Sequence, residues 1–273
     1  MDDQPNEEWT YSRFYPLHAA TQLGDMATVE ALIVKHKLSP NETDYDYLTP
    51  LHIACFSGHI AIVQMLIQFG AQVNARSIDG GTPLCGASAS GNYECVQLLL
   101  KNGAHVNPVH SLSTPLHEAA FAGNVNCADL LISCGALLNT YDCNYGTPLH
   151  AAVFQNQYKC IKRLLQAGAH INATKFHETP LHLAVSMNHT ESALELLRFG
   201  AKTTLTDNNN KKPIELIPNK SGILYETLYM TEKQPPLLQD LCRQVLVRNQ
   251  TLKKLISNYY LPQYLIDYIN FNY

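Results

Sequence analysis

A short sequence motif recurs along most of this 273-residue chain. Thr-Pro-Leu-His, or Thr-Pro-Leu-Cys in one copy, begins at Thr49, Thr82, Thr114, Thr147 and Thr179. The spacings are 33, 32, 33 and 32 residues, an earlier copy begins at Tyr15, and a Gly-Ala pair follows each threonine after 21 residues. A period of this length is typical of repeat architectures, in which one unit buries its apolar face only against its neighbours.

Each repeat predicts two helices and a loop. Threonine can accept a hydrogen bond from a free N–H of a first helical turn, and proline after it gives up a donor that has no partner there. A glycine about nine residues later, as at Gly58, Gly91 and Gly123, ends the first helix, and an apolar run such as IVQMLIQF forms a second. The sequence therefore predicts an all-α fold.

The pattern Thr-Pro-Leu-His-x-Ala-x-x-x-Gly, followed by Leu-Leu-x-x-Gly-Ala-x-x-Asn, resembles the ankyrin repeat. This resemblance implies a solenoid over residues 12–230, with six full repeats and a degenerate seventh, around Lys212 to Glu215, as a cap. Residues 1–11 are an N-terminal extension. The asparagines that follow the Gly-Ala pairs are interpreted as structural caps of the loops: Asn74, Asn107, Asn139 and Asn172.

Composition narrows the classes of partner. The formal net charge is -4 and the pI is about 6.3, so the chain has no basic field for nucleic acid or anionic lipid. The N-terminus, MDDQPNEEW, lacks the basic start and apolar run of a signal peptide, and no apolar run approaches ~18 residues. We expect a soluble, intracellular protein of the cytoplasm that binds neither nucleic acid nor membrane.

Twelve histidines and eight cysteines raise the question of a metal or a nucleophile. Five of the histidines occupy the same repeat position, and so lie on different repeats rather than around one ion. They are His18, His52, His117, His150 and His182. The cysteines form no C-x-x-C pair and are expected to be small buried hydrophobes. We therefore expect no metal, no cofactor and no catalytic residue.

The resemblance to ankyrin repeats implies a binding surface made by the loop tips and the exposed face of each first helix. The candidate substrate-binding residues are Tyr45, Arg76, Ile78, Asp79, His110, Tyr141, Lys175 and Phe176 on loops, and Phe56, Phe121, Phe154 and Met187 on helices. Phenylalanine recurs at one helix position, which favours a protein-binding stripe because aromatic residues are enriched in interface cores. The alternative is that some rings pack against the adjacent loop.

The repeat disappears from about Thr231, and Pro235-Pro236 marks a break. Apolar residues then recur at helical spacing in three short segments, the last of which begins near Pro262. A segment of about 40 residues is too small to bury so many apolar side chains by itself. Either the last repeat or another protein must cover them.

Two C-terminal motifs resemble a SOCS box. LLQDLCRQVL contains Leu-x-x-x-Cys-x-x-x-aliphatic, and LPQYLIDYI contains Leu-Pro-x-x-Leu-x-x-Tyr-Ile. In this order after ankyrin repeats, they make the chain similar to the ankyrin repeat and SOCS box proteins. The resemblance implies a three-helix SOCS box over residues 231–273. The implied elongin-binding residues are Leu238, Leu241, Cys242, Val245 and Leu246, and the implied cullin-binding residues are Leu261, Pro262, Leu265, Tyr268 and Ile269.

The function implied is that of a non-catalytic substrate-recognition subunit of a ubiquitin ligase. The repeats would hold an unidentified protein, and the box would recruit elongins B and C and cullin-5 with its RING-domain partner. One alternative is a non-catalytic ankyrin scaffold or inhibitor whose C-terminal helices only cap the solenoid. A metal-dependent or cysteine enzyme is a third class, but the repeat spacing separates the ligands that it would require.

Overall fold

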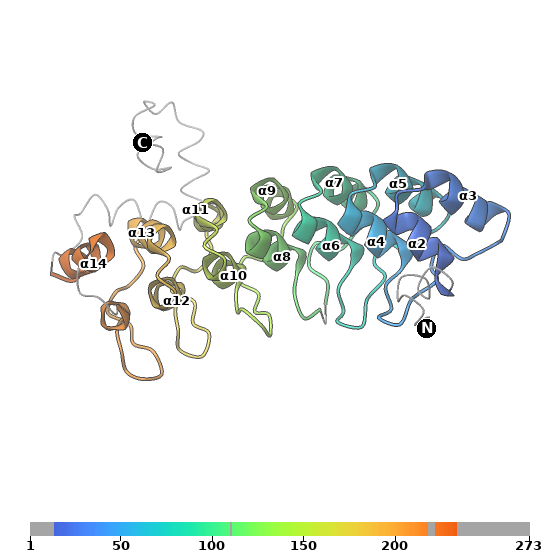
Figure 1. The fold of residues 1–273 in the computed structure, drawn as a ribbon. Helices are drawn as coiled ribbons and strands as arrows, with labels where there is room; N and C mark the ends of the chain where they lie inside the picture. Colours follow the sequence, from blue (N-terminus) through green and yellow to red (C-terminus); the bar gives the residue numbers. More distant parts are fainter. Residues whose placement is uncertain (1–13, 110, 218–221, 234–273) are drawn as a thin grey trace, which may run out of the picture. The chain divides into compact units, whose positions relative to one another are not determined.

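The computed structural model describes residues 14–109, 111–217 and 222–233 (Figure 1). In these ranges the chain is helical and contains no β-strand beyond an isolated bridge between Lys175 and Glu178. The chain divides into two compact units. The first holds the described residues up to Leu137 together with Asp142–Asn144, and the second holds Leu138–Tyr141 and the described residues from Tyr145 onward.

Short helices alternate with slightly longer ones in both units. The first unit contains α2 Pro16–Gln22, α3 Met26–Val34, α4 Pro50–Ser57, α5 Ile60–Gln68, α6 Pro83–Ser90, α7 Tyr93–Lys101, α8 Pro115–Ala122 and α9 Val125–Ser133. The second contains α10 Pro148–Phe154, α11 Tyr158–Ala167, α12 Pro180–Ser186, α13 Thr190–Arg198, the 3-10 helix η1 Pro213–Leu216 and α14 Ile223–Lys233. The predicted pair of helices per repeat is thus confirmed.

The repeated threonine and histidine hold the start of four of the described first helices, α4, α8, α10 and α12. At α4, the Thr49 N–H donates to His52 Nδ1 at 3.1 Å, and the Thr49 hydroxyl lies 2.9 Å from the same nitrogen. The other ring nitrogen, Nε2, lies 3.3 Å from the carbonyl oxygen of Gly81. Because a carbonyl can only accept, Nε2 carries the proton and Nδ1 is the acceptor. The histidine therefore joins its own helix to the loop of the next repeat.

Glycine ends the first helix in three repeats for two reasons. Gly58 and Gly91 adopt φ of 77° and 78°, a left-handed conformation that costs glycine little. A Cβ at these positions would also lie 2.6 and 2.7 Å from the side-chain oxygens of Asn92 and Asn124. Each asparagine amide instead approaches and donates to carbonyls at the end of the preceding first helix, as Asn92 does to Cys55 and Phe56. These contacts satisfy carbonyls that have no partner within the helix.

The second unit ends its first helices without glycine. α10 and α12 are followed by Asn156 and Asn188, which adopt φ of 54° and 57°. Asparagine tolerates this region better than most residues because its short polar side chain can bond locally. The Asn156 side-chain oxygen accepts a 2.6 Å hydrogen bond from the Ser192 hydroxyl. Asn156 thus both adopts the left-handed turn conformation and bonds to the next repeat.

The asparagine that follows four of the Gly-Ala pairs caps the loops, as predicted. The Asn74 amide donates to Gly103 O at 3.0 Å, while its oxygen accepts the His105 N–H at 2.8 Å. Asn107 makes the same pair of bonds to Gly135 and Leu137. Each side chain therefore reaches into the next repeat and satisfies the backbone just after its second helix.

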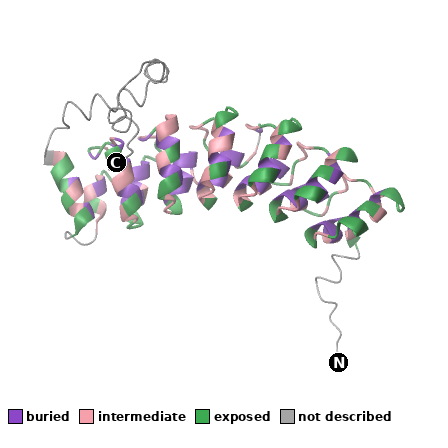
Figure 2. Cartoon of the chain, turned by 90° about the horizontal axis from the view of Figure 1, so that it is seen from above, coloured by how far each residue is buried: buried purple, intermediate pink, exposed green. Residues whose placement is uncertain are grey.

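The core of each unit lies between successive helix pairs (Figure 2). In the first unit α4 packs against α2 and α6, and α6 against α8, while α3, α5, α7 and α9 pack in the same order. Leu51, Leu84 and Leu116 are fully buried, and alanines such as Ala54 and Ala87 allow the helices to approach closely. Every first helix is therefore buried on the sides that face its neighbours.

Two cysteines depart from the expectation of burial. Cys55, Cys85, Cys95, Cys127 and Cys160 are buried, whereas Cys134 and Cys143 are exposed. Cys134 is the residue that ends α9, just before Gly135, and Cys143 lies on a loop. Neither place faces a neighbouring helix, so the prediction was wrong for these two residues.

The His52 bonds predict a dependence of stability on pH. Burial lowers the pKa of His52 from 6.5 to about 4. Between pH 6.5 and 4, His52 is therefore protonated in the unfolded chain but neutral in the folded chain. The contribution is fully present above pH 6.5 and is lost as pH falls towards 4, at roughly 1.4 kcal/mol per pH unit. We expect His52→Gln to flatten this part of the curve of unfolding free energy against pH, because glutamine can still act as the capping partner.

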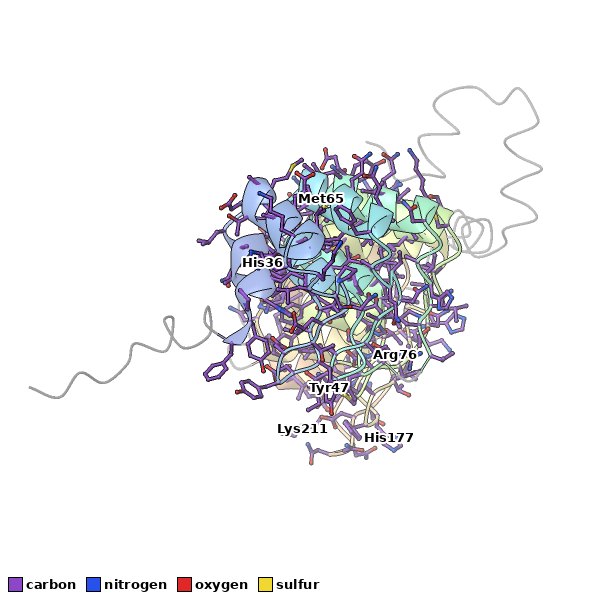
Figure 3. All side chains as sticks on the ribbon, turned by 90° about the vertical axis from the view of Figure 1, so that its right-hand side faces the viewer. His36, Tyr47, Met65, Arg76, His177 and Lys211 are labelled. Atoms are coloured by element: carbon purple, nitrogen blue, oxygen red, sulfur yellow. The ribbon has the colours of Figure 1, made fainter. Side chains whose placement is uncertain are left out.

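The matched control is His36→Gln, which replaces an exposed histidine after α3 (Figure 3). It should keep the wild-type slope when chemical unfolding is followed at several pH values. Equal slopes for both variants between pH 6.5 and 4 would contradict the role assigned to His52.

Candidate binding surface

The loops of the first unit carry a surface whose backbone is fixed by hydrogen bonds between repeats. The Ile78 N–H donates to Asp46 O at 2.8 Å, and the Leu112 N–H donates to Asp79 O at 3.3 Å. Figure 3 shows Tyr47 and Arg76 among these loops, away from His36 and Met65 on the side of the second helices. Residues that are far apart in sequence are therefore held at adjacent loop tips.

The predicted residues of the first unit fall into two groups. Tyr45, Ile78 and Phe56 are exposed by 77%, 63% and 61%, and Arg76 and Asp79 are exposed beside them. Phe121 forms the second group, because its side chain is half-buried and interacts with another residue. The structure brings Tyr45, Ile78 and Asp79 together through the bonds between their loops.

Two of the predicted residues of the second unit, Phe154 and Phe176, make ring contacts with nearby side chains. Tyr141 and Phe176 are exposed, and the Lys175 ammonium lies 5.6 Å from the centre of the Phe176 ring. The Phe154 ring lies 5.1 Å from that of Tyr145, and Phe154 is 37% exposed. Met187, which ends α12, is exposed to the same extent.

The three phenylalanines at one repeat position therefore differ. Phe56 presents most of its ring to solvent, whereas Phe154 packs on a ring from its own loop. Packing against the adjacent loop is thus observed for Phe154, whereas a binding role for the exposed Phe56 stays a prediction. Position in the repeat did not reveal the difference, because a tyrosine stands two residues before the repeat threonine at both Tyr47 and Tyr145, yet only Tyr145 pairs with the phenylalanine of its repeat.

Tyr47 belongs to the surface and was not among the predicted residues. It is exposed and adopts φ of 58°, a left-handed conformation in the turn between Asp44 and Leu48. The Tyr15 ring also packs edge-on against the Tyr45 ring at 5.3 Å. The alternation Asp-Tyr-Asp-Tyr at residues 44–47 was the available signal for this cluster.

The described residues hold no group of histidine, cysteine, aspartate and glutamate side chains that could bind a metal. Burial raises the pKa of the Cys95 and Cys127 thiols to about 11, with Glu94 adding to the effect. Such thiols are protonated near neutral pH and are poor nucleophiles. In the same ranges, no helix has the length and apolar character needed to cross a membrane.

Several predicted residues lie outside the described ranges. They are His110 on the third loop and every residue assigned to elongin or cullin binding, from Leu238 to Ile269. The roles of these residues remain predictions.

Comparison with known families agrees with the helix-pair architecture. The model of ankyrin repeats in three copies matches residues 17–110 and 109–175, and the model of the single ankyrin repeat matches residues 176–208. These matches cover most of the chain, which belongs to the ankyrin repeat family.

Solved ankyrin structures resemble the chain over most of their length. The ankyrin repeat domain of human ASB11 is 31% identical with a TM-score of 0.73, covering 81% of this chain and 99% of that domain. The ankyrin repeat domain of Bcl-3, a member of the IkappaB protein family, is 25% identical with a TM-score of 0.64. That match covers 78% of this chain and 97% of the Bcl-3 domain.

Similarity to curated proteins is confined to shorter segments. Alpha-latrocrustotoxin-Lt1a of Latrodectus tredecimguttatus is 41% identical over 61 residues, which are 22% of this chain and 4% of the toxin. Human ankyrin repeat domain-containing protein 49 is 37% identical over 84 residues, which are 28% of this chain and 35% of that protein. The chain thus spans well under two thirds of either relative.

The contrast between Phe56 and Phe154 can be tested by replacing each with serine. Phe154→Ser should lower the free energy of unfolding by about 1 to 2 kcal/mol, because it removes an aromatic pair. Phe56→Ser should change it by no more than about 0.5 kcal/mol, as for other exposed positions. Chemical denaturation of the two variants measures both values, and equal losses would show that Phe56 is also a packing residue.

Proposed function

We propose that this chain is the substrate-recognition subunit of a cytoplasmic elongin–cullin ubiquitin ligase. The ankyrin repeats bind the target protein, and the C-terminal segment binds elongins B and C and cullin-5. The chain itself performs no chemistry. It raises the effective concentration of a target lysine near the ubiquitin-conjugating enzyme that the cullin's RING-domain partner brings.

The observation that carries the proposal is the order of the C-terminal motifs behind an ankyrin domain. Leu238, Cys242 and Leu246 recur at the spacing of one helix face, and Leu261-Pro262 follows in the position of a cullin box. The preceding repeats are 31% identical to the ankyrin repeat domain of human ASB11. Together they match the arrangement of the ankyrin repeat and SOCS box proteins.

A protein-binding role for the repeats is supported by their exposed apolar side chains. Tyr45, Phe56 and Ile78 present large apolar areas to solvent on loops and a helix whose backbone is fixed. Such residues on a rigid support favour binding, because little conformational entropy is lost on association.

One observation favours the alternative of a scaffold with a capping tail. In the second unit a groove of about 510 Å³ is lined by Tyr158, Leu194 and Leu197 beside Thr227 and Thr231 of α14. It lies next to the helix from which the C-terminal segment continues, so that segment could cover it. Elongin binding distinguishes the two functions.

The elongin contact is tested by the double variant Leu238→Ala and Cys242→Ala. We expect it to abolish co-purification of elongin C, because truncating a buried leucine at an interface centre costs ~2 kcal/mol or more. Ser257→Ala, in the same C-terminal segment but outside both motifs, is the matched control and should retain elongin. Thermal unfolding should show the repeats intact in both proteins, and retained elongin in the double variant would refute the ligase assignment.

The cullin contact is tested separately by Leu261→Ala and Pro262→Ala. These changes should weaken cullin-5 binding by about tenfold or more while elongin C still co-purifies, since the two motifs are separate in sequence. Binding of purified cullin-5 to the elongin-loaded chain provides the measurement. Equal loss of both partners would show that the segment acts as one indivisible unit.

A further inference from the structure

The loop tips of the first unit combine exposed apolar side chains with carboxylates. We define the acidic loop-tip surface as Tyr45, Asp46, Tyr47, Ile78 and Asp79. Tyr47 is 57% exposed, and Tyr45 and Ile78 are more exposed still. The two aspartates are exposed between them. Apolar side chains and carboxylates thus lie next to each other on two adjacent loops.

The charge of this side of the unit is strongly one-sided. Its described loops and first helices carry the carboxylates of Glu42, Asp44, Asp46, Asp79, Glu118 and Asp142. Apart from Lys35 and Lys37, which directly follow α3 at the start of the first loop, Arg76 is the only lysine or arginine in those same described segments. In the second unit, by contrast, the loops carry Lys175, Lys202, Lys211 and Lys212 against the carboxylates of Glu178 and Asp207. The acidity therefore belongs to one set of loops rather than to the repeat itself.

The acidic groups differ in what they do. Asp44 accepts the N–H groups of Asp46 and Leu48 at 3.0 and 2.8 Å, so this carboxylate holds the turn together. Neither Asp46 nor Asp79 makes a side-chain hydrogen bond or ion pair with any residue that the structure describes. Their backbone carbonyls instead accept the bonds that join neighbouring loops. The fold thus uses their backbone and leaves their carboxylates available.

We infer that the acidic loop-tip surface recognises an arginine-bearing, apolar segment of the target protein. A guanidinium can stack on the Tyr45 or Tyr47 ring while it bonds to a neighbouring carboxylate, and an adjacent apolar side chain of the target covers Ile78. Arginine fits this arrangement better than lysine. Its planar group stacks on rings, pairs with carboxylates in two-pronged geometry and is less strongly hydrated.

The inference deepens the proposed function and rests on it only in taking the bound segment to be part of a ubiquitination target. The recognition itself is a property of the first unit, whereas ligase recruitment depends on the C-terminal motifs. A failure of segment recognition can therefore be distinguished from a failure of ligase recruitment.

The experiment uses the full chain and three short fluorescent peptides in which leucine alternates with arginine, lysine or glutamate. Fluorescence anisotropy should show that the arginine peptide binds more tightly than the lysine peptide, and that the glutamate peptide does not bind. The double variant Asp46→Asn and Asp79→Asn should bind the arginine peptide roughly tenfold more weakly than the wild type does. This difference in affinity should become smaller at high salt.

The matched control is Glu30→Gln with Glu94→Gln, which removes the same charge from exposed positions of α3 and α7 in the same unit. It should bind the arginine peptide as the wild type does. The inference would be overturned if both double variants lost the same affinity for the arginine peptide. It would also be overturned if the wild type bound the arginine and lysine peptides equally well, or showed no preference for the arginine peptide over the glutamate peptide.

Elongin C co-purification on the same proteins separates the two proposals. It should be unchanged in the Asp46 and Asp79 variant. Loss of peptide binding with elongin retained supports recognition by the loop tips, whereas a wild-type chain that binds the arginine peptide but no elongin would refute the ligase assignment alone.

Discussion

The fold depends on polar side chains that satisfy the backbone of a neighbouring repeat. Asn74 and Asn107 bind the residues just after the following second helix, while Asn92 and Asn124 bind the end of the preceding first helix. Buried backbone groups without partners are costly, and short helices leave many such groups. A chain of helices of seven to eleven residues is stable because neighbouring repeats complete one another's hydrogen bonds.

These same bonds separate the structural role of the loops from their side chains. At the first two loop tips, Asp46 and Asp79 contribute carbonyl oxygens that accept N–H groups of the adjacent loops. Because the backbone supplies the links, the side chains at these positions are free to vary with the partner. A protein of this design can therefore change what it binds with little change in its fold, which is typical of repeat proteins.

Most of the helical architecture could be predicted from the sequence, because the features that build it recur at a fixed period. Thr-Pro-Leu-His predicted the helix starts, and the Gly-Ala pairs predicted the ends of the second helices. The sequence was less informative where one repeat differs from the others. Asn156 and Asn188 replace the expected glycine, and Cys134 is exposed at a helix end. Such departures are decided by the neighbours of one residue, which no period encodes.

The candidate surface shows the same limit in a sharper form. Phe56 and Phe154 share a repeat position, yet only Phe154 has a ring, Tyr145, to pack against. Charge behaves similarly, since carboxylates gather at the loop tips around Asp46 and Asp79, whereas the loops of the second unit carry several lysines. Unpaired carboxylates at Asp46 and Asp79 do nothing for stability that an uncharged residue could not do, because their backbone makes the structural bonds. Their charge is therefore available for the recognition that we infer for this surface.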